Sequence, residues 1–522
     1  MSTNRRQFIK TAGAGIVGLG ISPVFARMYP FRIPDGKSDF PRASPESQGV
    51  SSQAILDFLA AANASGISWH SFMLLRHGQV VAEGWWKPFE AKYVHTLYSL
   101  SKSFTSTAIG LLVKEGKLDI HAPVVSFFPS DLPATVSENL KQVTVRHLLT
   151  MNTGHGEDTI PKMRASHDTW VRTWLAQPVE FAPGTHFLYN TGNTYMLGAI
   201  LYKVTGLTLE QYLKPRLFEP LGIVGYDWET SPQGLNTAGY GLRVKTEDIA
   251  KLGQLYLQKG VWKGASILPS AWVAEATSAQ TTSQVNNGDW SEGYGYQFWR
   301  CTHGAYRGDG AYGQYCIVMP EQDAVLAVTS QTPDMQKSLN IMWEHVFPGL
   351  KAGVLPEDVA GEKELKKSLA GLMLPVVKGA VASPSAARYQ GKKWTVADNE
   401  LGVKTLEFGF SGKGCRLTVG TGDKVKTLET GWEHWVVNPS HETYAFKAGD
   451  MVPMPTAIAG TATWVNDQTL QLNFRFVEAI FGDAVTFVFE GDKVGVTFLN
   501  SVAETATKKT PDPRKPLEGR LG

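Results

Sequence analysis

Cysteine is scarce in this sequence of 522 residues, and the three that are present, Cys301, Cys316 and Cys415, are widely spaced. So few cysteines exclude a disulfide-rich scaffold, and their spacing matches no zinc-binding pattern. Cys301 and Cys316 fall in two neighbouring predicted strands, so a bridge between them is geometrically conceivable. The alternative is that both are free, buried thiols.

Long apolar runs and low-complexity tracts are absent beyond the first few dozen residues. Their absence predicts that the chain has no transmembrane anchor. Hydrophobic residues make up 43% and charged residues 19% of the sequence, as in ordinary globular proteins. A chain of this length is expected to fold into two or more domains.

An excess of positive charge is also missing. The formal net charge is +2, and Arg5, Arg6 and Lys10 account for the surplus, so residues 27–522 carry 47 basic against 48 acidic side chains. This balance argues against a nucleic-acid partner.

The first 26 residues are typical of an export signal. Arg5, Arg6 and Lys10 precede a Gly/Ala/Ile/Val/Leu stretch that ends at Val24-Phe25-Ala26, which is the order of a twin-arginine signal and its cleavage site. The sequence therefore predicts a signal peptide over 1–26, an N-terminal arm over 27–44 and a periplasmic or secreted mature protein.

The remaining chain shows strands at both ends of a helical middle, which predicts an α+β domain whose sheet is completed by its C-terminal part. A connector over 351–384 with a helix from Gly361 to Leu372 precedes an all-β domain over 385–503, and we expect a disordered tail over 504–522. The predicted strands of the first domain are the hairpin 71–86 and the segments 294–301, 312–319 and 324–330; its predicted helices are 99–115, 139–151, 193–205, 246–259 and 335–346.

The strongest chemical signal is Ser99-Leu100-Ser101-Lys102, the one Ser-x-x-Lys in the sequence. It lies where a predicted strand gives way to an amphipathic helix, so Ser99 faces free backbone N–H groups and Lys102 lies on the same helical face. A buried lysine loses its proton more readily and can then activate a serine. Without its context, the motif also fits a helix-capping serine followed by a solvated lysine.

The surrounding residues resemble the serine β-lactamase and penicillin-binding-protein superfamily, in particular its class C-like esterases and 6-aminohexanoate-dimer hydrolases, over about residues 45–350. The resemblance implies a β-lactamase-like fold, an antiparallel sheet with flanking helices and a helical subdomain, and makes Ser99 the nucleophile and Lys102 its partner. It is carried, in the family's order, by 116–119 with Pro123, 144–151, 183–185, 218–222 and 294–296.

The family's Tyr-x-Asn motif has its counterpart at Tyr189-Asn190-Thr191. The resemblance makes Tyr189 a general base, held partly ionised near Lys102. Thr191 stands where the family has the asparagine that binds the acyl side chain, with Asn190 beside it, and both are candidate substrate-binding residues. This departure from the family lowers the expectation of strong β-lactamase activity.

The family's Lys/His-Thr/Ser-Gly triplet is not visible. Counting back from Gly310, it falls on Ala305-Tyr306-Arg307, with His303-Gly304 as a second position. Gly308 is the position expected to offer an oxyanion-binding N–H, and Arg307 is a candidate partner for a substrate carboxylate. A plain glycine-rich turn is the alternative.

The sequence thus predicts an exported serine hydrolase that cleaves a small-molecule or peptide-like ester or amide through an acyl-enzyme on Ser99. Nothing in the motifs implies a metal or another cofactor. Two alternatives stay open: a penicillin-binding D-alanyl peptidase or β-lactamase, and a non-catalytic binding or sensor protein on the same fold.

Overall fold

The computed structural model describes residues 40–283, 288–422, 424–439, 444–447, 456–505 and 511–522, which belong to one compact unit. The predicted signal peptide over 1–26 and most of the arm over 27–44 lie outside the described residues. Among the helices that the structure describes, none is both long and apolar enough to span a bilayer.

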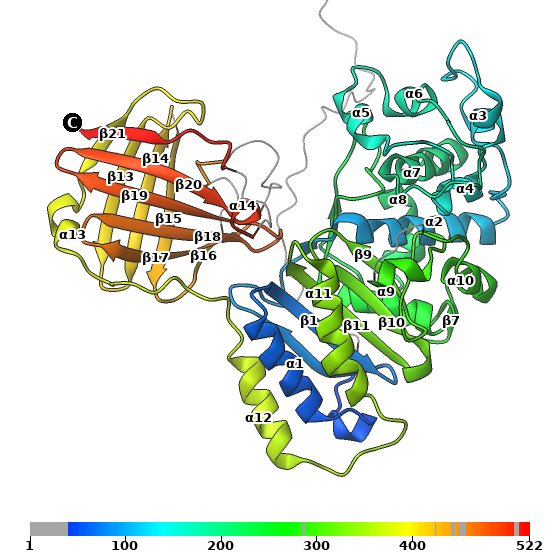
Figure 1. Ribbon diagram of the computed structural model, residues 1–522, viewed down its shortest axis with the longest axis horizontal. Coiled ribbons are helices and arrows are strands. Elements are labelled where there is room, and N and C mark those ends of the chain that lie inside the picture. The colour runs from blue at the N-terminus through cyan, green and yellow to red at the C-terminus, as the bar shows by residue number, and fades with distance from the viewer. Residues whose placement is uncertain (1–39, 284–287, 423, 440–443, 448–455, 506–510) are drawn as a thin grey trace, which may run out of the picture. The chain divides into compact units, whose positions relative to one another are not determined.

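The first domain is built on a six-stranded antiparallel sheet with strand order β2-β1-β11-β10-β9-β8 (Figure 1). Its N-terminal hairpin turns at His77-Gly78, where both residues have positive φ, and β1 then pairs with β11, with Phe72 opposite Val328. Strands from both ends of the domain therefore share one sheet, and the predicted α+β class is confirmed. The bounds are β1 (Ser68–Arg76), β2 (Gln79–Trp85), β8 (Trp299–Arg300), β9 (Tyr306–Gly310), β10 (Gln314–Met319) and β11 (Ala324–Gln331).

Helices cover both faces of this sheet (Figure 1). One face packs on α1 (Ser52–Ala64), α11 (Met335–Ile341) and α12 (Val359–Ala370), and the other on α2 (Ser101–Lys114) and α9 (Thr246–Leu257). The alternation of side chains along a strand explains why both faces are apolar.

Cys301 and Cys316 lie in the clusters on opposite faces of the sheet. Both thiols are free, so the bridge that their sequence positions left open does not form. The buried free thiols predicted as the alternative are confirmed.

Short helices form the helical subdomain beside the sheet (Figure 1). Their N-termini are fixed by local capping, as at α4, where Thr144 and His147 form a reciprocal capping box. The remaining elements of this domain are α3 (Glu138–Gln142), α4 (Val145–Leu149), α5 (Ile160–Ala165), α6 (Trp170–Leu175), α7 (Thr191–Thr205), α8 (Leu209–Leu213), α10 (Ser270–Ala276), β3 (His95–Thr96), β4 (Asp227–Trp228), β5 (Leu242–Val244), β6 (Val261–Trp262) and β7 (Ala265–Ser266).

One predicted strand of this domain is largely wrong. Within 294–301 only Trp299 and Arg300 form a strand, because the chain turns back at Gly295, whose N–H donates to the carbonyl of Phe298, and Gln297 has a φ of 65°. The apolar residues of this segment pack in the core without extending along the sheet.

The second domain is a barrel of ten strands in the order β15-β14-β13-β12-β21-β20-β19-β18-β17-β16. The prediction of an all-β domain is therefore confirmed. A parallel pairing of β15 with β17, with Gly431 opposite Thr461, links the two ends of the sheet. The bounds are α13 (Pro384–Tyr389), β12 (Lys393–Val396), β13 (Thr405–Ser411), β14 (Gly414–Thr421), β15 (Lys424–Trp432), β16 (Val436–Asn438), β17 (Ile458–Asn466), β18 (Thr469–Phe476), β19 (Gly482–Glu490), β20 (Lys493–Asn500), α14 (Ser501–Thr505) and β21 (Leu517–Leu521).

The prediction of a disordered tail over 504–522 is wrong for its described end. Leu517–Leu521 form β21, which is hydrogen-bonded between β12 and β20. Leu517 and Gly519 are buried and alternate with exposed Glu518 and Arg520. The basic and proline-rich composition of the tail concealed this short alternating strand.

Candidate active site

Ser99 lies in η2 (Tyr98–Leu100), the single turn that leads into α2. The preceding Tyr98 has a φ of 48°, a left-handed conformation that is strained for a residue with a large side chain. Strain of this kind is common where a side chain must be presented at a functional site. Ser99 stays half-buried at the end of the otherwise buried α2.

Lys102 lies one turn along α2 and is 1% exposed. Its Nζ donates to Ser99 Oγ at 3.1 Å, to Thr191 Oγ1 at 3.3 Å and to the carbonyl of Gly239 at 2.9 Å. Burial lowers the pKa of Lys102 to about 7, although Asp158 and Asp309 act in the opposite direction. Because half of the lysine side chains are then neutral near pH 7, Lys102 can accept a proton from Ser99.

Tyr189 contacts both of these residues. Its hydroxyl interacts with the Ser99 side chain, and Lys102 Nζ lies 4.9 Å from the centre of its ring. Burial, with the charge of Asp309, raises the pKa of Tyr189 well above its usual value. The expectation of a partly ionised phenol is therefore wrong: the neutral hydroxyl can pass a proton on, and Lys102 is the group that ionises near neutrality.

The two residues after Tyr189 have different surroundings. Thr191 is half-buried and contacts Lys102 directly. Asn190 is 0% exposed, and its Oδ1 accepts hydrogen bonds from Thr159 Oγ1 at 2.8 Å and from the N–H of Gly192 at 3.0 Å. Asn190 therefore caps α7 and does not face a substrate, contrary to the prediction.

The third motif maps to β9, where the outcome is mixed. A Cβ on Gly308 would lie 2.5 Å from Leu100 Cδ1 and from Ser103 Oγ, so this position needs glycine for β9 to approach α2. The pairing of β8 with β9 covers Tyr306 and Arg307, which leaves the edge beyond Arg307 free of β8. The oxyanion-binding role of Gly308 stays a prediction.

Arg307 cannot meet a substrate carboxylate as predicted. Successive side chains of a strand point to opposite faces, so Arg307 points away from the face on which Gly308 approaches α2. It is 0% exposed and forms an ion pair with Asp309, from Nε to Oδ2 at 3.0 Å. The position is basic in the sequence, but its charge is neutralised in the fold.

Four groups near Ser99 were missed by the sequence analysis: the carbonyl of Gly239, Asp158, Asp309 and Trp299. Asp158 Oδ1 accepts a hydrogen bond from the N–H of Thr191 at 2.9 Å, and the Trp299 ring stacks on Tyr189 at 5.5 Å. The carbonyl has no side-chain signature, and only folding brings the others to Lys102 and Tyr189. For Asp309, proximity to the third-motif region was an available signal.

Together these groups place a serine hydroxyl against a buried lysine and beside a tyrosine hydroxyl, an arrangement that is suited to acyl transfer. Over the described ranges, no group of three or more His, Cys, Asp or Glu side chains is arranged to hold a metal ion.

Comparison with known proteins agrees with this geometry. The family model described as Beta-lactamase matches residues 53–350. The chain is 28% identical over 308 residues to 6-aminohexanoate-dimer hydrolase of Paenarthrobacter ureafaciens, a match that covers 55% of this chain and 76% of that protein. It is 27% identical over 173 residues to Esterase EstB of Burkholderia gladioli, covering 30% and 43% respectively.

Among solved structures, EstCE1, a hydrolase with promiscuous acyltransferase activity, is similar with 17% identity and a TM-score of 0.48, over 57% of this chain and 99% of that one. The family match spans more than half of the sequence and includes Ser99, Lys102 and Tyr189. The chain belongs to the beta-lactamase family.

Proposed function

We propose that this chain is an exported serine hydrolase that cleaves ester or amide bonds through an acyl-enzyme on Ser99. The observation that carries the proposal is the direct contact between Ser99 Oγ and Lys102 Nζ at 3.1 Å, with the lysine pKa near 7. Relatives that are named as a hydrolase and an esterase support the same class of reaction.

The reaction follows from these contacts. Ser99 Oγ attacks the substrate carbonyl while its proton passes to neutral Lys102. Tyr189 gives its proton to the leaving group as the carbon–oxygen or carbon–nitrogen bond breaks, and the Lys102 ammonium then returns a proton to Tyr189. Water then attacks the acyl-enzyme, gives up a proton to the relay and releases the acid, which restores Ser99. Backbone N–H groups of Ser99 and of the β9 edge would stabilise the oxyanion.

Because Arg307 on β9 is paired with Asp309, it is not free to bind a substrate carboxylate. This favours an ester or amide that lacks a carboxylate next to the scissile bond. A β-lactam and a D-alanyl peptide carry such a carboxylate, and Arg307 is not available to pair with it.

A substrate panel tests the proposal. Wild type and Ser99→Ala are assayed with short p-nitrophenyl esters, linear amides, D-amino-acid amides and a chromogenic cephalosporin. We expect Ser99-dependent turnover that is fastest with esters. Fast turnover of the cephalosporin or of D-alanyl amides would replace the proposal by the β-lactamase or peptidase alternative, and absence of Ser99-dependent turnover across the panel would favour the non-catalytic one.

Export is tested separately by cell fractionation. The full chain with Arg5→Lys and Arg6→Lys should stay in the cytoplasm, since the twin-arginine route reads that pair. Unchanged fractionation of this double variant would contradict the export proposal and leave the hydrolase proposal intact.

A further inference from the structure

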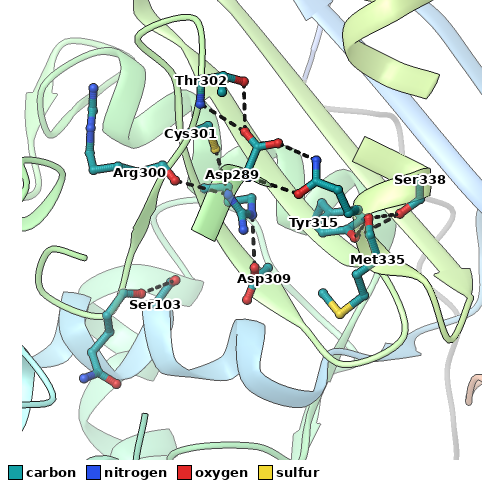
Figure 2. Close-up of polar contacts among 12 residues, drawn as sticks. Ser103, Asp289, Arg300, Cys301, Thr302, Asp309, Tyr315, Met335 and Ser338 are labelled. Carbon is teal, nitrogen blue, oxygen red and sulfur yellow. Dashed lines mark hydrogen bonds and ion pairs between the residues drawn. The ribbon is translucent and has the colours of Figure 1, made fainter. Parts of the chain in front are cut away.

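A network of buried polar side chains is centred on β9 (Figure 2). Arg307 donates from Nε to Asp309 Oδ2 at 3.0 Å and from Nη1 to Cys301 Sγ at 3.0 Å, and its guanidinium lies 4.6 Å from the Trp290 ring centre. The carboxylate of Asp289 adds a second negative charge that acts on Arg307. The arginine thus neutralises charge that would otherwise be buried at high cost.

Asp309 connects this network to the catalytic side chains. Besides Arg307, its carboxylate interacts with the indole N–H of Trp299, a residue that the pairing of β8 with β9 sets opposite Arg307. Trp299 is itself 6% exposed, and its ring stacks on Tyr189 with a centroid distance of 5.5 Å and an angle of 23°. A chain of contacts therefore runs from Arg307 through Asp309 and Trp299 to the hydroxyl that meets Ser99.

Two carboxylates act on Lys102, Asp158 from the loop before α5 and Asp309 from β9. The other groups against Lys102 are the hydroxyls of Ser99 and Thr191, the carbonyl of Gly239 and the Tyr189 ring. The charged or titratable groups that interact with Asp309 are Arg307, Lys102, Tyr189, Tyr294, Tyr315 and Cys301.

We propose that Asp309 is a positioning residue of the proton relay: it holds Trp299 against Tyr189, and its negative charge acts on Lys102 and so sets the pH at which Ser99 is activated. This inference rests on the proposed function, because the relay matters only if Ser99 is acylated. The charge of Asp309 stabilises the ammonium form of Lys102 and so opposes the effect of burial.

The test compares Asp309→Asn with Asp289→Asn in the full chain. Both variants remove one buried carboxylate that acts on Arg307, and Asp289 is held by Thr302, Gln336 and Trp343, outside the relay. The readouts are the pH dependence of kcat/KM with a p-nitrophenyl ester and the thermal unfolding midpoint.

Without the carboxylate charge, neutral Lys102 persists to lower pH, so in Asp309→Asn the acid limb of kcat/KM should move down by about 0.5 to 1 pH unit. The acid limb of Asp289→Asn should coincide with wild type even if that variant unfolds at a lower temperature. An unmoved limb in Asp309→Asn, or an equal shift in both variants, would overturn the proposal.

If Asp309→Asn does not fold, Trp299→Phe decides, because it keeps an aromatic ring beside Tyr189 but lacks the N–H that Asp309 holds. We expect kcat to fall about fivefold or more with KM unchanged, since a misplaced relay slows chemistry. An unchanged kcat would contradict the positioning role. Loss of Ser99-dependent turnover in wild type would instead sink the proposed function itself.

Discussion

Two buried arginine–aspartate clusters, one in each domain, have nearly the same chemistry and different surroundings. In the hydrolase domain, Arg307 and Asp309 side chains are 0% and 6% exposed. In the barrel, Arg514 is 3% exposed and pairs with Asp483 and Asp512 at 2.6 and 2.7 Å. Burial of an ion pair therefore does not by itself indicate a functional site.

The difference lies in the groups with which each cluster interacts. Asp309 acts on Lys102 and Tyr189, whereas Arg514 bonds the carbonyl of Phe446 and lies 4.5 Å from the Phe498 ring, all within the barrel. The barrel cluster ties the segment before β21 to β19. We infer that the first cluster tunes chemistry and the second holds the fold.

The largest effect should come from removing Lys102, the proposed base on which the charge of Asp309 in the first cluster acts. Lys102→Met should lower kcat by about 10³-fold, because Ser99 loses its proton acceptor. A matched control is Lys251→Met, since Lys251 is equally buried and pairs with Asp248 at 3.2 Å; it should keep kcat. Steady-state kinetics on an ester measures both, and equal losses would contradict the assignment of Lys102.

The variant Lys102→Met should lose activity and yet be more stable than wild type. The Lys102 pKa of about 7 lies below the ordinary 10.5, so the charged form is disfavoured in the fold and Lys102→Met should be more stable by roughly 1 to 3 kcal/mol at pH 7. The difference in unfolding free energy between Lys102→Met and wild type should narrow as the pH rises from 7 toward 10.5, because the lysine of the unfolded chain then also loses its proton. Denaturant unfolding at pH 7 and 9.5 measures the change.

Removing the arginines should break both clusters with similar cost. Arg307→Met and Arg514→Met each leave buried carboxylates unpaired and should lose about 3 to 5 kcal/mol of unfolding free energy. Only Arg307→Met should also lower the kcat of the folded protein. Denaturant unfolding with parallel kinetics checks this, and a lowered kcat in folded Arg514→Met would remove the distinction between the clusters.

A smaller effect is expected at Asp512. Burial raises the pKa of its carboxyl, but hydrogen bonds with Arg514 and Asn500 and the charge of Arg514 outweigh burial and lower this pKa to about 2. Because this folded pKa lies below the unfolded one, Asp512 contributes stability above about pH 4 that is lost as the pH falls toward 2. Asp512→Asn should therefore cost about 1 to 3 kcal/mol at pH 7 and less at each step down to pH 2.5. A difference from wild type that does not change with pH would contradict the account.

The smallest effect should be at Cys301, which accepts a hydrogen bond from Arg307. Cys301→Ser keeps an acceptor there and should change the unfolding free energy by less than about 1 kcal/mol. Cys415→Ser places a hydroxyl in the apolar barrel core and should cost about 1 to 3 kcal/mol. Denaturant unfolding of both variants measures these costs. A larger loss of unfolding free energy in Cys301→Ser than in Cys415→Ser would show that a hydroxyl does not replace the thiol as an acceptor for Arg307.

Local patterns predicted much of this molecule. The hairpin of β1 and β2, the helices α2, α7 and α9 and the all-β character of the second domain were predicted because periodicity and turn residues are encoded within each segment. Lys102 was predicted for the same reason, since three residues along a helix place it beside Ser99.

The failures share a different cause. Arg307, Asp309 and Asn190 were misjudged or missed because strand alternation and contacts between distant segments decide what each side chain meets. The Tyr189 pKa was misjudged because burial and the charge of Asp309 raise it. The sequence shows which groups are present, and the packing determines which of them are charged.

The most direct test of the central claim is covalent labelling of Ser99. The mature protein is incubated with a fluorophosphonate and weighed intact by mass spectrometry, with Ser99→Ala as control. The account predicts one phosphonyl adduct on wild type, located by peptide mapping at Ser99, and none on the variant. An unlabelled wild type, or a variant that labels equally, would contradict the assignment of Ser99 as the nucleophile.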